Sequence, residues 1–197
     1  MDLKILKAAV QKSIDARAEE IMEIADKIYK NPETGFREHK TAALVAGEFR
    51  KISEQISVLQ DIPGVKITLD TGRPGPGIAI LGEMDALLCP DHPDADPDTK
   101  AMHACGHNQQ VAAMIGALQG IWASEAHKGL VGKLHFIAVP AEECIEVGFR
   151  RKLREQGVIS YFTGKAELLS RGFFDDVDLC LLSHASTRDC KFSLTGS

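Results

Sequence analysis

Hydrophobic residues recur along the first thirty positions at the spacing of an α-helix. The pattern predicts one long amphipathic helix that ends at the sequence NPETG (31–35). A second helix is predicted over about 39–56, with alanine, valine and phenylalanine on its buried face. The apolar positions of the first helix are Leu3, Leu6, Val10, Ile14, Ile21, Ile24 and Ile28.

From residue 64 onward the pattern becomes one of strands alternating with helices. GVKITLD (64–70) alternates like a strand, and GIAILGEMDAL (77–87) opens with the continuous apolar run of a strand buried on both faces. Further elements are predicted in chain order: a helix over 109–124, a buried strand over 132–140, a mixed helical stretch over 149–171 and a last strand over 176–186. This alternation predicts an α/β fold with a mostly parallel central sheet.

Composition and charge exclude several classes of function. The chain has 197 residues, about one domain, with a net charge of −5 and no basic stripe, so nucleic acid and anionic membranes are poor partners. No apolar stretch is long enough to span a bilayer, and the N-terminus lacks the apolar core of a signal peptide. Five cysteines without a CxxC pair indicate free thiols, so we expect a cytoplasmic protein.

Residues suited to acid–base or metal chemistry follow three of the predicted strands. Because reactive groups gather at the carboxyl ends of strands in such sheets, we expect them at one edge. The segment HACGH (103–107) lies between a strand and a helix at the same expected edge. The strand-end residues are Glu83 and Asp85, then Glu142 and Glu143, then His184.

Each signal also has a structural interpretation. HACGH could be a polar turn around Gly106, and adjacent glutamates commonly begin a solvated helix. A strand-end histidine is commonly structural, and Asp85 could cap a helix. Together, however, these residues fit one mechanism. Imidazole, thiolate and carboxylate groups would bind two divalent metal ions, and one of two adjacent glutamates would act as general base.

The order of GEMDAL, MHACGHN, PAEE and a strand-end histidine resembles the M20 metallopeptidase family. The similarity is strongest to its amidohydrolases, which act on N-acyl amino acids and related amides (aminoacylase, hippurate, auxin-conjugate and aminobenzoyl-glutamate hydrolases). NPETGFREHKTA (31–42) also resembles the opening of that subfamily. The resemblance implies a three-layer αβα zinc-peptidase-like domain that hydrolyses amide bonds in N-acyl amino acids, small peptides or related conjugates.

The resemblance also implies roles for individual residues. Glu142 would be the general base that activates a water bridging two metal ions, and Asp85 would orient a metal ligand. His103 would have a supporting place near the site. The ions would be zinc, or manganese, nickel or cobalt. Their ligands in this chain would be Cys105, His107, Glu143 and His184.

Four features depart from the family pattern. Asn108 stands where the family usually has aspartate, no glycine-rich sequence follows PAEE, and residues 144–180 predict an extra helical excursion over the site. The chain also stops about where the family inserts its lid or dimerisation domain. We therefore expect residues 1–197 to be the N-terminal portion of the catalytic domain, without a further histidine ligand. A homodimer is expected only of a full-length protein.

Two other hypotheses remain open at this stage. The chain could be a non-catalytic metal-binding or interaction fragment derived from such an enzyme. Alternatively, Cys105 could be a nucleophile with His107 or His103 as its base, which would leave PAEE without a function.

Overall fold

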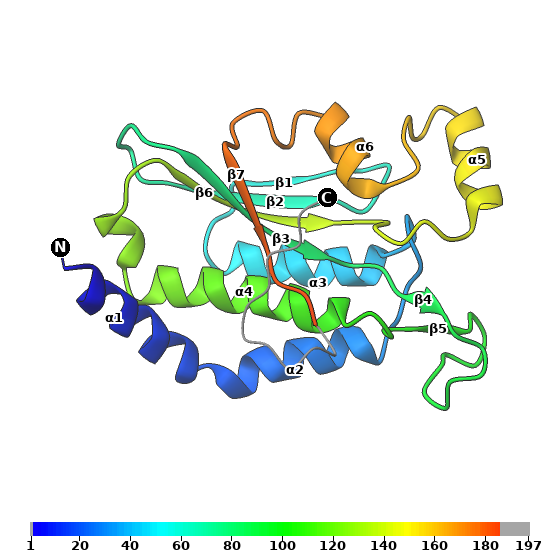
Figure 1. Ribbon diagram of the computed structural model, residues 1–197, viewed down its shortest axis with the longest axis horizontal. Coiled ribbons are helices and arrows are strands. Elements are labelled where there is room, and N and C mark those ends of the chain that lie inside the picture. The colour runs from blue at the N-terminus through cyan, green and yellow to red at the C-terminus, as the bar shows by residue number, and fades with distance from the viewer. Residues whose placement is uncertain (1, 186–197) are drawn as a thin grey trace.

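The structure is a computed structural model that describes residues 2–185, and its centre is a five-stranded sheet (Figure 1). The sheet confirms the α/β class. Across the sheet the strands are β1 (Ile56–Val58), β2 (Val65–Asp70), β6 (Lys133–Val139), β3 (Gly77–Glu83) and β7 (Leu179–Leu182).

The sheet is mixed, which corrects the expectation of a mostly parallel one. β3 pairs in parallel with both β6 and β7, whereas β2 pairs antiparallel with β1 and β6. The loop at 59–64 joins β1 to β2, and the loop at 71–76 joins β2 to β3. Both loops are too short for a parallel crossover, which needs a dozen or more residues, so β2 runs opposite to β1 and to β3. Since β6 is parallel to β3, β2 is antiparallel to β6 as well. The three strands followed by the predicted site residues form the parallel part.

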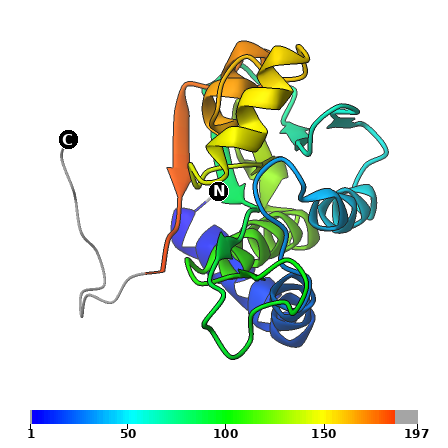
Figure 2. The same cartoon turned by 90° about the vertical axis from the view of Figure 1, so that its right-hand side faces the viewer.

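Helices cover both faces of the sheet, as the three-layer prediction requires (Figures 1 and 2). On one face lie α3 (His39–Arg50) and α4 (His107–Ala123), and α4 is covered in turn by α1 (Leu3–Asp15) and α2 (Ala18–Tyr29). On the other face lies α6 (Gly164–Ser170), whereas α5 (Val147–Glu155) lies beyond the end of β6 (Figure 1). The smaller elements are a 3₁₀ turn (Ala126–Gly129) and the short strands β4 (Leu87–Leu88) and β5 (Ala101–Met102).

Strand β6 shows how the core is divided between the two faces. Phe136 and Ala138 pack into the cluster shared with α2, α3 and α4, whereas Ile137 and Val139 pack into the cluster shared with Leu168 of α6. Because successive side chains of a strand point to opposite faces, the part of β6 that is covered on both sides, residues 136–139, is a continuous apolar run.

Several predicted boundaries are wrong. The single helix predicted at the N-terminus is two helices, interrupted at Ala16 and Arg17. The helix predicted over 39–56 ends at Arg50, and Ile56 is the first residue of β1. The predicted strand over 77–87 ends at Glu83, and the stretch over 149–171 contains most of α5 and all of α6. The interruption between α1 and α2 has no local signal, since neither proline nor glycine occurs there.

None of the helices within residues 2–185 has the length and apolar character needed to cross a membrane. Within the same residues the cysteines are free thiols: Cys89, Cys105, Cys144 and Cys180. Cys190 lies outside the described residues, and so does the last residue of the strand predicted over 176–186.

Candidate metal centre

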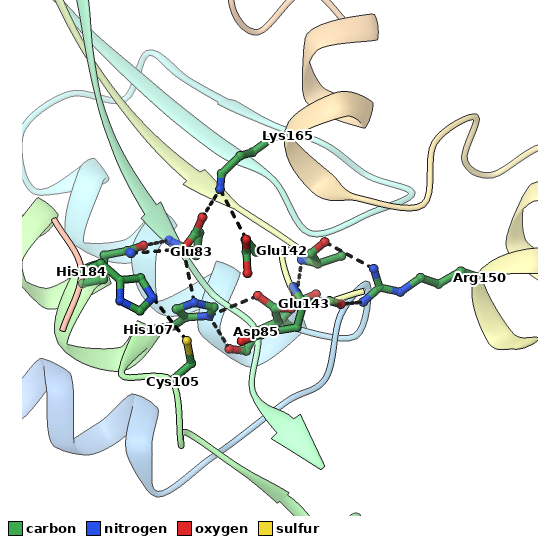
Figure 3. A network of polar contacts seen from close by, with 12 residues as sticks. Glu83, Asp85, Cys105, His107, Glu142, Glu143, Arg150, Lys165 and His184 are labelled. Atoms are coloured by element: carbon green, nitrogen blue, oxygen red, sulfur yellow. Dashed lines mark hydrogen bonds and ion pairs between the residues drawn. The ribbon is translucent and has the colours of Figure 1, made fainter. Parts of the chain in front are cut away.

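The parallel strands bring the predicted site residues to one edge of the sheet. Glu83 ends β3, Glu142 and Glu143 follow β6, and His184 follows β7, while the loop before α4 brings Cys105 and His107. Figure 3 shows their side chains directed toward one another. The expected convergence at the carboxyl edge of the strands is therefore present in the fold.

Gly106 makes the sharp bend between the two residues of the CGH motif. It is the N-cap of α4 and has a φ of 86°, a left-handed conformation that strains a residue with a side chain. A Cβ atom at this position would also lie 3.1 Å from the Cβ of Ala185. Gly106 therefore lets Cys105 and the first residue of α4, His107, approach the segment that follows β7.

Asp85 fixes the orientation of the His107 ring. Nδ1 of His107 lies 2.8 Å from the backbone carbonyl oxygen of Asp85 and 3.3 Å from its Oδ1. Because a carbonyl oxygen only accepts hydrogen bonds, Nδ1 carries a proton. The other ring nitrogen, Nε2, faces Glu83 on the opposite side of the ring. Oδ2 of Asp85 accepts the backbone N–H of Glu143 at 2.9 Å. Asp85 therefore orients both His107 and the PAEE loop, residues 140–143.

The surroundings of His107 favour a positive charge at its ring. Burial alone would lower the pKa of His107, but the carboxylates of Asp85 and Glu83 raise this pKa to about 10. Surroundings that stabilise an imidazolium also stabilise a metal cation bound to the ring.

One cluster of donor atoms consists of Cys105, His107 and His184, whose ligand atoms lie within 4.8 Å of one another. Sγ of Cys105 is 3.2 Å from Nε2 of His184, and Nδ1 of His184 donates to the carbonyl oxygen of Ala185 at 2.7 Å. Glu143, the fourth predicted ligand, is outside this cluster although it lies beside the thiol. Burial and the carboxylate of Glu143 raise the pKa of Cys105 to about 12.

A second cluster consists of Glu83, His107 and Glu142. Nε2 of His107 is 3.2 Å from Oε2 of Glu83, which also accepts the side-chain N–H of Gln110 at 3.1 Å. Nζ of Lys165 contacts Oε1 of Glu83 and lies 3.7 Å from Oε1 of Glu142. Burial and the nearby carboxylate of Glu83 raise the pKa of Glu142 above its usual value.

Glu83 stands at a predicted strand end but had no expected role, and no pattern in the sequence pointed to Lys165 or Gln110. Burial opposes the ionisation of Glu83, but hydrogen bonds from His107, Lys165 and Gln110 hold its pKa at about 2. Glu83 is therefore a buried anion at the centre of the second cluster.

These donor sets fit divalent metal ions. Imidazole, thiolate and carboxylate are ligands of zinc, and the same donors suit manganese, nickel and cobalt. Nε2 of His107 is buried, with Oε2 of Glu83 3.2 Å away, and belongs to the ring that both clusters share. Because Nε2 has one lone pair and binds one ion, the two clusters are overlapping candidate positions for metal around this ring, and Glu142 belongs to one of them.

The arrangement argues against Cys105 as a nucleophile. A nucleophilic cysteine needs a lowered pKa and a base that takes its proton. The pKa of this thiol is instead raised by burial and by Glu143, and the ring that it contacts belongs to His184, not to His107 or His103. His103 is buried nearby, where burial and His107 lower its pKa to about 4.

The PAEE loop is held by groups that the sequence did not reveal. Ala141 has a φ of 50°, and its N–H donates to the buried carboxylate of Glu38 at 2.7 Å. Its carbonyl oxygen accepts from the N–H of Gly164 at 3.0 Å and from the guanidinium of Arg150 at 3.4 Å. Arg150 is fully buried and also donates to the carbonyl oxygen of Glu143. The strained turn before the two glutamates is therefore fixed on both sides.

The remaining histidines are engaged outside this cluster. The ring of His135 lies between Thr68 and the backbone of Asp176, and His127 stacks on Trp122 at 4.6 Å. His92 accepts the N–H of Asp94, and His39 begins α3. None of them contributes to the two clusters found within residues 2–185.

An α/β sheet with two donor clusters and a neighbouring carboxylate at its carboxyl edge defines a class of candidate metallohydrolases. Residues 79–177, half of the 197-residue chain, match the model of peptidase family M20/M25/M40. The chain therefore belongs to this family, which confirms the resemblance seen in its motifs.

Known proteins agree with this assignment. The chain is 32% identical over 145 residues to thermostable carboxypeptidase 2 of Saccharolobus solfataricus, a match that covers 71% of this chain and 36% of the relative. It is 32% identical to the IAA-amino acid hydrolase ILR1-like 2 of Arabidopsis thaliana, with 71% and 31% covered. The crystal structure of YXEP of Bacillus subtilis, a dinuclear metal-binding peptidase of the M20 family, superposes with a TM-score of 0.64 and 25% identity. That match covers 84% of this chain and 42% of the other. The chain thus spans about a third of the length of the two relatives and 42% of the YXEP chain.

Proposed function

We propose that this chain carries the metal-binding and general-base part of an amidohydrolase. Its substrates would be N-acyl amino acids, small peptides or related conjugates, in line with the carboxypeptidase and amino acid conjugate hydrolase among its relatives. The observation that carries the proposal is the shared position of His107 in two donor clusters, one of which contains Glu142. The reaction would take place in the cytoplasm, where the thiol of Cys105 stays reduced.

Two divalent metal ions are proposed as cofactors, with Cys105, His107, Glu143 and His184 as ligands from this chain. When bound, such ions lower the pKa of a coordinated water and polarise an amide carbonyl. The contact between Glu143 and the thiol supports its place among these ligands. Asp85 would not bind metal itself but would fix the orientation of the His107 ring.

Glu142 is proposed as the general base. It would take a proton from the attacking water and deliver it to the amine that leaves when the amide bond breaks. Its partly buried carboxylate has a raised pKa, which favours holding that proton between the two steps.

We further propose that residues 1–197 are the N-terminal portion of the catalytic domain. The lid or dimerisation domain and another histidine ligand would then come from additional polypeptide, and a homodimer would form through that domain. The one-third coverage of the relatives supports this view. The exposed leucines of β7 support it too, because further parts of a domain could cover them. The same coverage also favours the second candidate, a metal-binding fragment without catalysis.

Glu142→Gln tests the proposal. Amide hydrolysis is measured over a panel of acyl amino acids and dipeptides. The chain is assayed alone and in the presence of a second polypeptide that corresponds to the part of a relative this chain does not cover. The mixture of the two is called the supplemented protein. The substitution is expected to lower kcat by about 10²–10⁴-fold, because the amide cannot accept a proton. Metal content, measured by elemental analysis, is expected to stay unchanged.

Glu143→Gln is the matched control at the adjacent position. It removes a proposed ligand and is expected to lower the metal content together with the rate. Full activity in Glu142→Gln would refute the general base. Hydrolysis of no panel substrate by the supplemented wild type, with metal bound, would favour the non-catalytic fragment.

A further inference from the structure

The first turn of α6 is packed directly against the end of strand β6. The N–H of Gly164 donates to the carbonyl oxygen of Ala141 at 3.0 Å, one residue before Glu142. A Cβ atom at Gly164 would lie 1.6 Å from the carbonyl oxygen of Pro140, so no other residue fits this approach without movement of the backbone. The contact fixes the position of the next residue, Lys165, relative to the PAEE loop.

The Lys165 side chain crosses from α6 to the two acidic strand ends (Figure 3). Its ammonium group contacts Oε1 of Glu83 and lies 3.7 Å from Oε1 of Glu142. The Glu83 side chain is 2% exposed and that of Lys165 is 43% exposed, so the lysine reaches from the surface to a buried anion. Two carboxylates this close repel each other, and a cation between them offsets that repulsion.

We propose that Lys165 is a positioning residue for the hydrolytic reaction, whose ammonium group bridges Glu83 and Glu142 and so holds the Glu142 carboxylate in place. The inference rests on the proposed function of Glu142. Because the ammonium group lies near one oxygen of the Glu142 carboxylate, at ion-pair distance, the other oxygen stays available for proton transfer. The excursion formed by residues 144–180 would thus contribute to the reaction through one side chain.

The ion pair is tested first, without any catalysis, by a double-variant cycle. Urea denaturation midpoints are compared for the wild type, Lys165→Met, Glu142→Gln and the double variant. If Lys165 holds Glu142, the midpoint loss of the double variant is smaller than the sum of the two single losses. Additive losses would overturn the inference. Lys152→Met, at an exposed lysine of α5, is the control that is expected to be additive with Glu142→Gln.

Kinetics then test the consequence for the reaction in the supplemented protein. Lys165→Met is expected to lower kcat by about 10- to 100-fold, the cost of a misplaced catalytic group, with KM nearly unchanged. Lys165→Arg is expected to restore most of this loss, and Lys152→Met to lose nothing. In the Glu142→Gln background, Lys165→Met should cause no further loss.

The outcomes separate this inference from the proposed function. An unchanged kcat in Lys165→Met, or a higher KM alone, would overturn the positioning role while hydrolysis itself stands. A wild type that hydrolyses nothing would refute the proposed function and with it the catalytic consequence of Lys165. The double-variant cycle would still decide whether Lys165 holds Glu142.

Discussion

His107 is the residue on which both donor clusters depend. Its ring is fixed by the carbonyl oxygen and carboxylate of Asp85, and its other nitrogen is shared between the cluster with Cys105 and the cluster with Glu83. A ring fixed in this way presents one nitrogen to a metal ion without rotating, so little side-chain entropy is lost when the ion binds.

Cys105 provides the sharpest test of metal binding at the scale of a residue. We expect one to two equivalents of metal per chain in the wild type after purification without chelator, and clearly less in Cys105→Ser. The reason is that a thiolate binds zinc and similar ions more strongly than a hydroxyl group does. Elemental analysis measures both. Cys144→Ser, at an exposed thiol outside both clusters, should keep the full metal content. Equal metal in all three proteins would contradict the assignment of Cys105.

At the scale of elements, the site depends on how the loop after β6 is held. Ala141 is in a left-handed conformation that costs free energy, and three elements stabilise it: the segment before α3 through Glu38, α5 through Arg150 and α6 through Gly164. α5 and α6 therefore fix the two glutamates, and α6 also packs on the sheet.

Gly164→Ala tests this packing. The added methyl group would overlap the carbonyl oxygen of Pro140, so we expect a loss of about 1–3 kcal/mol in the free energy of unfolding. Gly47→Ala is the control, because Gly47 is exposed inside α3 with no atom within 4 Å of the added carbon. That change should stabilise the protein by about 0.5–1 kcal/mol through helix propensity. Equal effects in urea denaturation would show that α6 does not pack as described.

At the scale of the whole molecule, β6 contains a buried titratable group away from the metal centre. His135 is fully buried, with Nδ1 2.9 Å from Oγ1 of Thr68 and Nε2 3.2 Å from the carbonyl oxygen of Asp176. Burial and the positive charge of Lys66 lower its pKa, and these effects outweigh the opposing effect of Asp176. The folded protein therefore keeps this ring neutral in a pH range where the unfolded chain protonates it.

This difference predicts that stability is lost as the pH falls. The unfolded histidine binds a proton near pH 6.5, and the folded one does so only at lower pH, so unfolding takes up protons between the two values. The free energy of unfolding should decline from about pH 6.5 downward, and His135→Gln should flatten that decline. His92→Gln, at an exposed histidine, should leave the slope unchanged. An NMR titration that gives His135 an ordinary or raised pKa would contradict the prediction.

The amino-acid sequence by itself determined the α/β class and the main strands, and it singled out Cys105, His107 and His184, whose ligand atoms the fold brings together. A continuous apolar run identifies a strand buried on both faces, because a strand with one exposed face has polar side chains at alternate positions. The CGH motif, PAEE and the strand-end histidine then mark where chemistry follows those strands. These motifs could be recognised from the sequence because their residues lie next to their own strand or helix ends.

Only the tertiary structure decided what lies between those elements. The break between α1 and α2 depends on packing against α4, where Ile14 and Ile21 meet Gly120 and Gly116, and no local residue signals it. Lys165 reaches Glu83 only because α6 docks on the end of β6, a contact between segments far apart in the chain. Periodicity reports local burial, whereas an ion pair between distant segments depends on how whole elements pack, so it could not be predicted from the order of residues.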